Sequence, residues 1–201
     1  MKYDYVDIGT CDFDTSYDVA KPGEQVLLVE PLQYYLDRIP DRKDQKKANV
    51  AVSASSGRIT VYHVPDVTIH LFDLPRWVRG CNSIGIRHPT VDNLLKHRNL
   101  PLSLVNKTEV EVITFRELCS RYQITEINKL KIDTEGHETF IMPTVLEMVK
   151  EGMYIEEIKF ENQEILGNKP FLDILAQEFV KLGFYEITEV TSMDTTLKIT
   201  K

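Results

Sequence analysis

The chain has 201 residues, of which 42% are hydrophobic and 27% charged, and its formal net charge is −7. This length suits one domain with its own core, and the composition excludes a disordered or coiled-coil protein, while no apolar stretch approaches the roughly 20 residues of a membrane span. The 31 acidic residues against 24 basic ones argue against a general nucleic-acid-binding protein, because such proteins bind phosphates through Lys and Arg.

The first elements along the chain are β-prone segments with one helix between them. Residues 3–8 predict a strand that stops at Gly9. The nearly continuous apolar run at 25–29 predicts a strand buried on both faces, as in a parallel sheet. Apolar residues at i, i+3, i+4 and i+7 then predict an amphipathic helix over residues 32–39.

The middle of the chain is less regular. Residues 48–53 predict a third strand, and residues 58–64 alternate as a half-exposed antiparallel strand should. Residues 65–108 carry four prolines and no sustained period, so we expect an irregular excursion with one short helix near 91–96. Excursions of this length in a compact domain are typically lids or binding loops, and we expect this one to hold the acceptor-binding residues, with Gly80–Gly85 as its flexible polar patch.

Strand and helix patterns alternate in the second half up to a closing pair of strands. Pro143 should break the helix expected over residues 139–150 or start a fresh turn within it. The alternation predicts an α/β fold in which residues 1–201 form one domain, with a mainly parallel sheet and helices on both faces. We expect strands at 109–114, 129–133 and 155–160, helices at 115–122, 139–150 and 171–182, and a terminal antiparallel pair at 184–190 and 195–199.

Polar residues follow the predicted strands at the positions where ligands bind in such a sheet, outside the carboxyl ends. Asp7 and Gly9 lie at the first of these ends, and Gly9 allows a ligand to approach the backbone. Glu30 follows Asp7 by 23 residues, the place of an acidic residue that accepts hydrogen bonds from ribose hydroxyls. The pattern therefore favours a nucleoside cofactor over a simple turn.

The first turn is unsuited to a dinucleotide. Cys11 and Asp14 occupy the two later glycine positions of the dinucleotide pattern, and Phe13 between them is bulky. Asp12 and Asp14 would repel a pyrophosphate, which prefers a helix N-terminus with few carboxylates nearby. A cationic, phosphate-free nucleoside suits this loop better, which indicates S-adenosylmethionine. An NAD-binding oxidoreductase on a similar sheet is a less favoured alternative.

Four segments resemble the FkbM family of S-adenosylmethionine-dependent methyltransferases. They are Asp7-Ile8-Gly9, Val29-Glu30-Pro31, Asn49-Val50-Ala51-Val52-Ser53 and, above all, Lys131-Ile132-Asp133-Thr134-Glu135-Gly136-His137-Glu138. The last contains every specified residue of the family's pattern Lys-Ile-Asp-x-Glu-Gly-x-Glu. The resemblance runs from about residue 4 to residue 199. It implies the Rossmann-like sheet of class I methyltransferases, with a last antiparallel strand inserted into it.

The resemblance also implies roles for particular residues. Asp133 to Glu138 would lie beside the transferred methyl group. The methionine side of the cofactor would be lined by Asp7, Gly9, Thr10 and Cys11, its ribose held at Glu30 and Pro31, and its adenine bordered by Ala51, Val52 and Ser53. The chain departs from the family at Phe13 and Asp14, where a small residue is usual. This departure keeps a non-catalytic binding or scaffolding domain as an alternative.

Methyl transfer requires alignment of the acceptor atom, methyl carbon and sulfur, and a hydroxyl acceptor also benefits from a base. Asp133 and Glu135 match the motif and are predicted to orient the acceptor or to accept its proton. His137 has a suitable unperturbed pKa for the same task, although the family pattern leaves this position unspecified. For Glu138 we expect a structural role at the start of the following helix.

No resident metal is predicted, since no firm ligand spacing occurs. His63, His70, His88 and His97 are expected to be surface or hydrogen-bonded histidines. The alternative is a Mg²⁺ site, for which hard oxygen ligands would come from Asp133, Glu135, Glu161 and Asn162.

The three cysteines form neither a CxxC pair nor an even set, which indicates a reduced, cytoplasmic setting without disulfides. The N-terminus lacks the pattern of a secretory signal. Taken together, the sequence predicts O-methylation of a hydroxyl on a sugar, glycan or other small molecule. The oligomeric state is left open.

Overall fold

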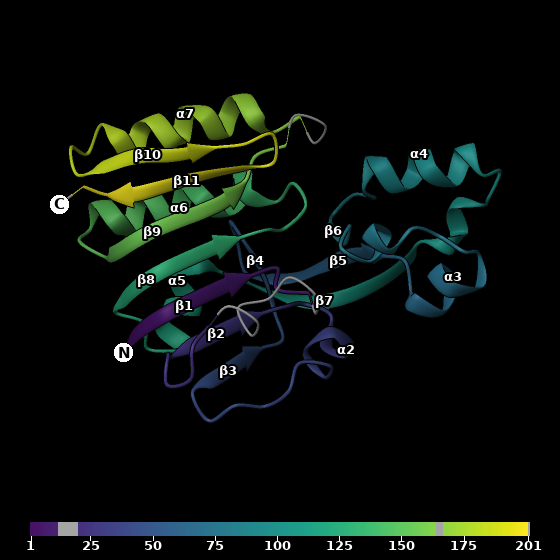
Figure 1. Ribbon diagram of the computed structural model, residues 1–201, viewed down its shortest axis with the longest axis horizontal. Helices are drawn as coiled ribbons and strands as arrows, with labels where there is room; N and C mark the ends of the chain where they lie inside the picture. Colours follow the sequence, from purple (N-terminus) through teal and green to yellow (C-terminus); the bar gives the residue numbers. More distant parts are fainter. Residues whose placement is uncertain (12–19, 164–166, 201) are drawn as a thin grey trace.

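The computed structural model describes residues 1–11, 20–163 and 167–200, and Figure 1 shows how their helices and strands are arranged. Five neighbouring strands of the main sheet run parallel. The last strand of the chain is inserted antiparallel between two others, so the predicted closing antiparallel pair is confirmed. The seven strands, in the spatial order β10-β11-β9-β8-β1-β2-β3, are β1 (Lys2–Ile8), β2 (Val26–Val29), β3 (Gln45–Ala48), β8 (Glu126–Ile132), β9 (Tyr154–Glu161), β10 (Tyr185–Val190) and β11 (Asp194–Ile199).

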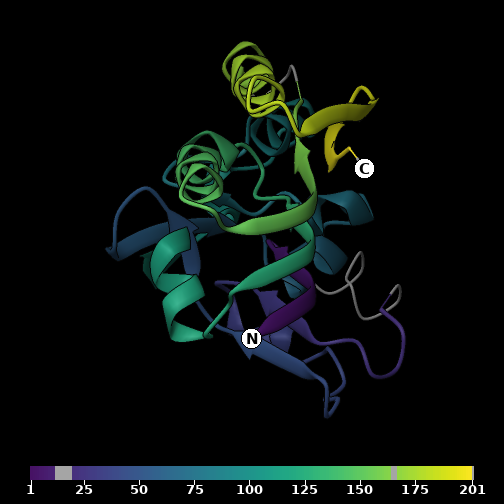
Figure 2. The same ribbon diagram turned by 90° about the vertical axis from the view of Figure 1, so that its left-hand side faces the viewer.

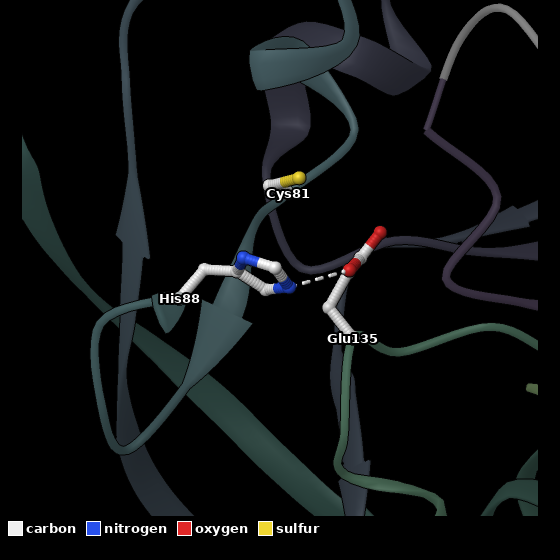
Figure 3. Close-up of side chains that lie close together, drawn as sticks. All are labelled: Cys81, His88 and Glu135. Atoms are coloured by element: carbon white, nitrogen blue, oxygen red, sulfur yellow. Dashed lines mark ion pairs between the residues drawn. The ribbon is translucent and has the colours of Figure 1, made fainter. Parts of the chain in front are cut away.

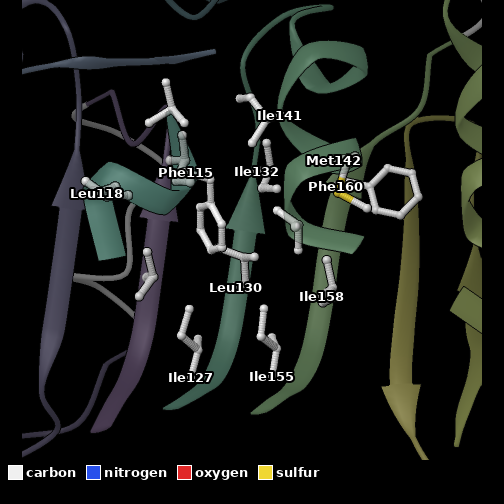
Figure 4. Packing of buried hydrophobic residues seen from close by; sticks show 14 of the residues in the cluster. Phe115, Leu118, Ile127, Leu130, Ile132, Ile141, Met142, Ile155, Ile158 and Phe160 are labelled. Carbon is white, nitrogen blue, oxygen red and sulfur yellow. The ribbon is translucent and has the colours of Figure 1, made fainter. Parts of the chain in front are cut away.

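Three helices cover one face of this sheet, as Figure 2 shows. They are α5 (Phe115–Arg121), α6 (Glu138–Lys150) and α7 (Lys169–Val180). Isoleucines and leucines of β8 and β9 point toward them and form the largest hydrophobic core together with side chains such as Ile141 and Met142 of α6 (Figure 4). On the opposite face, Leu36 of the short helix α2 (Gln33–Leu36) packs with Val26 and Leu28 of β2. The two faces are therefore covered unequally.

A second sheet, which the sequence did not predict, contains β4 (Ala51–Ser53), β7 (Asn106–Thr114), β5 (Gly57–His63) and β6 (Ser83–Ile84). The predicted strand over 48–53 was wrong in its extent, because the chain leaves the main sheet after Ala48 and enters the second sheet at Ala51. The side chain of Asn49 donates hydrogen bonds of 3.0 and 2.9 Å to the carbonyls of Glu30 and Pro31. These two hydrogen bonds hold in place the residues through which the chain passes from the main sheet to the second sheet.

The predicted irregular excursion over 65–108 was also wrong in part, because this segment has its own small core. The expected helix is present as α4 (Pro89–His97), but the segment also contains β6, α3 (Asp66–Leu71) and two 3₁₀ turns, η1 (Arg76–Arg79) and η2 (Leu102–Leu104). Five buried apolar side chains hold these short elements together, namely Val64, Leu74, Val78, Val91 and Leu95.

Helix α6 runs through Pro143 without the predicted break. Proline removes one backbone hydrogen bond and crowds the preceding turn, but the buried face of the helix, which includes Ile141, Met142 and Val145, keeps it on the sheet. Among the described residues, none of the helices is both long and apolar enough to cross a membrane.

Candidate active site

The turn after β1 brings the ends of three strands into contact. The N–H of Gly9 donates to the carbonyl of Val29 in β2 over 2.9 Å. Gly9 has a φ of +84°, and a Cβ on it would lie 1.8 Å from the carbonyl oxygen of Asp133, just after β8. Only glycine fits this approach. Residues Asp12, Phe13 and Asp14, on which the preference against a dinucleotide depended, lie outside the described residues.

The carboxylates of Asp7 and Glu30 hold this first turn in place through hydrogen bonds. Asp7 is fully buried and accepts a 2.9 Å hydrogen bond from the hydroxyl of Thr10. Glu30 is 3% exposed, and its two carboxylate oxygens accept the N–H of Cys11 at 3.1 Å and of Leu32 at 2.9 Å. Glu30 thereby couples the end of β2 to the turn after β1.

A pocket at this edge of the sheet gathers most of the residues predicted to hold a cofactor. Those that line it are Gly9, Cys11, Glu30, Pro31, Ala51, Val52 and Asp133, and Glu135, predicted to be catalytic, lines it with them. They come from the ends of four strands in two sheets. Asp7 is buried and does not line this pocket, and Thr10 lines a neighbouring pocket together with Trp77 and Cys81. Ser53 and His137 line a third, larger cavity.

This larger cavity has a volume of about 640 Å³ and adjoins the first pocket through Glu135 and Ile84, which line both. The Nε2 atom of His137 lies 2.9 Å from the hydroxyl of Ser53, and the imidazole stacks on Phe140 with ring centres 4.6 Å apart. Burial lowers the pKa of His137 to about 4, so the ring is neutral near pH 7. The cavity therefore offers a neutral imidazole and a hydroxyl next to an acidic group.

The turn between β8 and α6 is held by Glu138. Its carboxylate accepts the N–H of Thr134 at 2.6 Å, the hydroxyl of Thr134 at 2.7 Å and the N–H of Gly136 at 3.0 Å. Burial raises the pKa of Glu138 to about 7. Glu138 therefore has a structural role in the first turn of α6, but the expected capping of that helix was wrong, because its hydrogen-bond partners precede the helix. The turn places Glu135 at a φ of +53°.

Three acidic side chains meet where the pockets join. One carboxylate oxygen each of Asp133, Glu135 and Glu161 lies within 4.8 Å of the others. Burial and the two neighbouring carboxylates raise the pKa of Glu161 to about 10, and burial raises that of Glu135. Asn162, the fourth residue of the alternative Mg²⁺ set, donates its side-chain amide N–H groups to Asp173 and Thr195, and its Oδ1 atom makes no hydrogen bond.

Sequence reasoning missed Cys81 and His88, which form a second cluster with Glu135. His88 is 4% exposed, and its Nε2 atom lies 3.0 Å from a carboxylate oxygen of Glu135 (Figure 3). Of the expectation that His88 is a surface or hydrogen-bonded histidine, the surface part was wrong, because the residue is buried; its Nε2 atom is paired with Glu135, and its Nδ1 atom makes no hydrogen bond. By contrast, His63 is hydrogen-bonded to Thr108, as expected. No spacing rule in the sequence signals a pair so distant from Glu135.

Comparisons with known proteins agree with this architecture. A family model described as the methyltransferase FkbM domain matches residues 7–184. Among solved structures, the crystal structure of methyltransferase FkbM from Methylobacillus flagellatus KT is similar, with a TM-score of 0.53 and 12% sequence identity. The similarity covers 100% of this chain and 44% of that one, so this chain spans less than half the length of the solved protein. No curated protein matches the chain.

Proposed function

This chain belongs to the FkbM methyltransferase family, and on that premise we propose that it transfers a methyl group from S-adenosylmethionine to a hydroxyl of a sugar, glycan or other small molecule. The observation that carries the proposal is the convergence of Gly9, Glu30 and Asp133 on one pocket. Each of these residues follows a different strand at the carboxyl edge, where ligands bind in open α/β sheets.

The strand order supports a class I, Rossmann-like methyltransferase fold as part of this proposal. Renumbered along the chain, the seven main-sheet strands have the order 3-2-1-4-5-7-6, with the seventh antiparallel. This is the arrangement that the family resemblance implies. We also propose that residues 1–201 act as a single methyltransferase-like domain, with the 65–108 segment as the part that contacts the acceptor.

The chemistry of the first pocket supports a cationic cofactor. Three of its lining side chains are carboxylates, those of Glu30, Asp133 and Glu135. A sulfonium gains from such an environment, whereas a pyrophosphate is repelled by it. Within the proposal, Asp7, Thr10 and Cys11 shape the methionine side through the first turn. Pro31 and Glu30 border the ribose, and Ala51 and Val52 border the adenine, whereas Ser53 lines the adjoining cavity.

The adjoining 640 Å³ cavity is the proposed acceptor site. Glu135 lines both this cavity and the cofactor pocket, and Asp133, whose carboxylate lies within 4.8 Å of that of Glu135, lines the cofactor pocket. The two are therefore placed to orient an acceptor hydroxyl and to accept its proton. His137 lines the acceptor side and is hydrogen-bonded to Ser53. Because its pKa is lowered to about 4, we assign it to positioning the acceptor and give the role of base to the carboxylates.

Calorimetric titration with S-adenosylmethionine and with its demethylated product tests cofactor binding. We expect both to bind the wild-type protein. The variant Glu30→Gln should bind more weakly, whereas Glu186→Gln, which alters an exposed carboxylate on β10, should bind as the wild type does. Absence of binding of either compound at millimolar concentration contradicts the proposal, and binding of NAD in their place would favour the oxidoreductase alternative.

Methyl transfer to a panel of hydroxylated acceptors then tests catalysis. Loss of a positioned base typically costs a factor of about 100 to 10,000 in rate, so we expect a decrease in that range for Glu135→Gln. His137→Gln, which keeps a hydrogen-bonding group next to Ser53, should lose less than Glu135→Gln. If cofactor binds but no acceptor is methylated, the non-catalytic alternative gains support.

A further inference from the structure

We propose that Cys81, His88 and Glu135 bind a divalent transition-metal ion of the zinc class, which ties the 65–108 segment to the carboxyl edge of the main sheet. The inference goes beyond methyl transfer, because it concerns an ion and a tether that the proposed reaction does not by itself require. Figure 3 shows the three side chains pointing toward one another.

The geometry of the three side chains is close to that of a metal site. One ligand atom each of Cys81, His88 and Glu135 lies within 4.8 Å of the other two. Ligands of a tetrahedral zinc ion at about 2.0 to 2.3 Å from the metal are about 3.3 to 3.8 Å apart. The 4.8 Å limit exceeds these separations by about 1 to 1.5 Å, which is the distance that side-chain rotations would have to close.

The state of His88 itself indicates a ligand. Its side chain is 4% exposed, its Nε2 atom has only the Glu135 carboxylate beside it, and its Nδ1 atom makes no hydrogen bond. Buried polar groups of native proteins are nearly always partnered, and a buried polar atom without a partner destabilises the fold. The Nε2 atom points at Glu135 from 3.0 Å, so an ion bound between the two residues satisfies the imidazole and the carboxylate together.

The surrounding charges also favour a cation. Glu135 belongs to a second group with Asp133 and Glu161, whose ligand atoms also lie within 4.8 Å of one another. Glu161 is 5% exposed, and its Oε2 atom has no hydrogen-bond partner. Buried carboxylates this close repel one another. Lys131 lies 3.2 Å from Asp133, and a divalent ion would offset the remaining negative charge while taking its fourth ligand from Glu161, which leaves the role of base in methyl transfer to Asp133.

The ligand types select the class of ion. Mg²⁺ and Ca²⁺ prefer oxygen ligands alone, whereas thiolate and imidazole ligands favour Zn²⁺ and similar transition metals. A cationic amine could also be attracted by the carboxylates, but it gains nothing from a thiol. The inclusion of Cys81 and His88 therefore favours a transition metal over the Mg²⁺ alternative raised by the acidic residues alone.

Such an ion would join parts of the fold that are far apart in the chain. Cys81 and His88 flank β6 in the 65–108 segment, whereas Glu135 follows β8 of the main sheet. Gly80 and Asn82, next to Cys81, line the proposed cofactor pocket. Metal binding would therefore hold this wall of the pocket in place.

Titration of the metal-free protein with Co²⁺ under a phosphine reductant tests the proposal without any methyl donor. We expect a thiolate-to-cobalt absorption band that Zn²⁺ displaces. The band should vanish in Cys81→Ser. In His88→Gln the affinity for Co²⁺ should fall at least about 100-fold, because even the loss of a residue that only hydrogen-bonds to a metal ligand costs up to about 100-fold. Cys119→Ala removes a buried thiol of α5 from the main core and should leave the band unchanged.

Hydrogen exchange provides a second, independent measurement. With Zn²⁺ present, amides of residues 76–88 should exchange more slowly in the wild-type protein and in Cys119→Ala, but not in Cys81→Ser or in Cys81→Ala. Circular dichroism of each variant verifies that it is folded. A wild-type protein without the cobalt band, or a band that survives in Cys81→Ser, overturns the proposal. Either result leaves cofactor binding, measured separately, unaffected.

Discussion

Residues with positive φ occur at two turns of the candidate site. Gly9 has a φ of +84°, Cys11 of +48° and Glu135 of +53°. For residues with a side chain this conformation costs of the order of 1 to 3 kcal/mol, and it persists only where the surroundings enforce it. Here the enforcement is visible, because Glu30 holds the N–H of Cys11 and Glu138 holds the N–H groups on either side of Glu135. The two carboxylates therefore maintain the shape of the pocket.

Gly9→Ala tests how tightly the ends of β1 and β8 approach. The added Cβ would meet the carbonyl of Asp133 at 1.8 Å, so the backbone must move. Overpacking of this kind costs about 1 to 3 kcal/mol, and the positive φ adds about 1 kcal/mol. We expect urea denaturation to show a free energy of unfolding about 2 to 4 kcal/mol below that of the wild type.

The matched control for this prediction is Gly152→Ala. Gly152 also has a positive φ, of +103°, but its added Cβ would meet nothing within 4 Å. It should lose only about 1 kcal/mol from backbone strain. Equal losses in the two variants would show that the approach of Gly9 to Asp133 is not a steric constraint.

His63 gives a pH-dependent prediction that is independent of the candidate site. Burial lowers the pKa of His63, so below the usual pKa of about 6.5 the unfolded chain binds a proton that the folded protein resists. Stability is therefore lost as the pH falls through 6.5. His63→Gln can keep the hydrogen bond to Thr108, which is 3.0 Å long, but has no proton to bind.

Urea denaturation of both proteins between pH 5 and 8 measures this effect. The wild type should lose stability relative to His63→Gln on acidification, while the difference stays constant above pH 7. A difference that does not change with pH would contradict a lowered pKa.

Helix α5 begins with a capping box in which both hydrogen bonds are present. The hydroxyl of Thr114 accepts the N–H of Glu117 at 3.1 Å, and the carboxylate of Glu117 accepts the N–H of Thr114 at 3.1 Å. Loss of such a cap typically costs about 1 kcal/mol. We expect Thr114→Ala to lower the free energy of unfolding by about that amount in urea denaturation. Thr68→Ala, inside α3, removes no cap and should change it by less than about 0.5 kcal/mol.

The elements that were predicted well are those whose signal lies within a few consecutive residues. The apolar run that became β2 is buried throughout, and the periodic pattern after Thr114 became α5. The errors occurred where distant residues decide the structure. Asn49 redirects the chain by bonding to Glu30 and Pro31, and a buried face carries α6 through Pro143. Neither effect can be read from local propensity.

At the scale of the whole molecule, the parallel arrangement explains why strand-end residues could be predicted to share a pocket. Parallel strands place their carboxyl ends at one edge, so Gly9, Glu30 and Asp133 meet there despite their separation in the chain. The approach of Cys81 and His88 to Glu135 depends instead on how the 65–108 segment folds onto its own core. That packing involves no repeating pattern, and the cluster was therefore missed.

Cofactor binding should stabilise the whole domain, since a ligand that binds only the folded state raises its stability by mass action. At about 100 times its dissociation constant, S-adenosylmethionine should contribute about 2.7 kcal/mol. For a domain of this size that corresponds to an increase in Tm of about 5 to 10 °C. Differential scanning calorimetry should show this shift with the cofactor and with its demethylated product, but not with NAD. Glu30→Gln should reduce the shift, whereas Glu186→Gln should preserve it. A shift with NAD alone would contradict the assignment of the pocket, and an undiminished shift in Glu30→Gln would contradict the role given to that carboxylate.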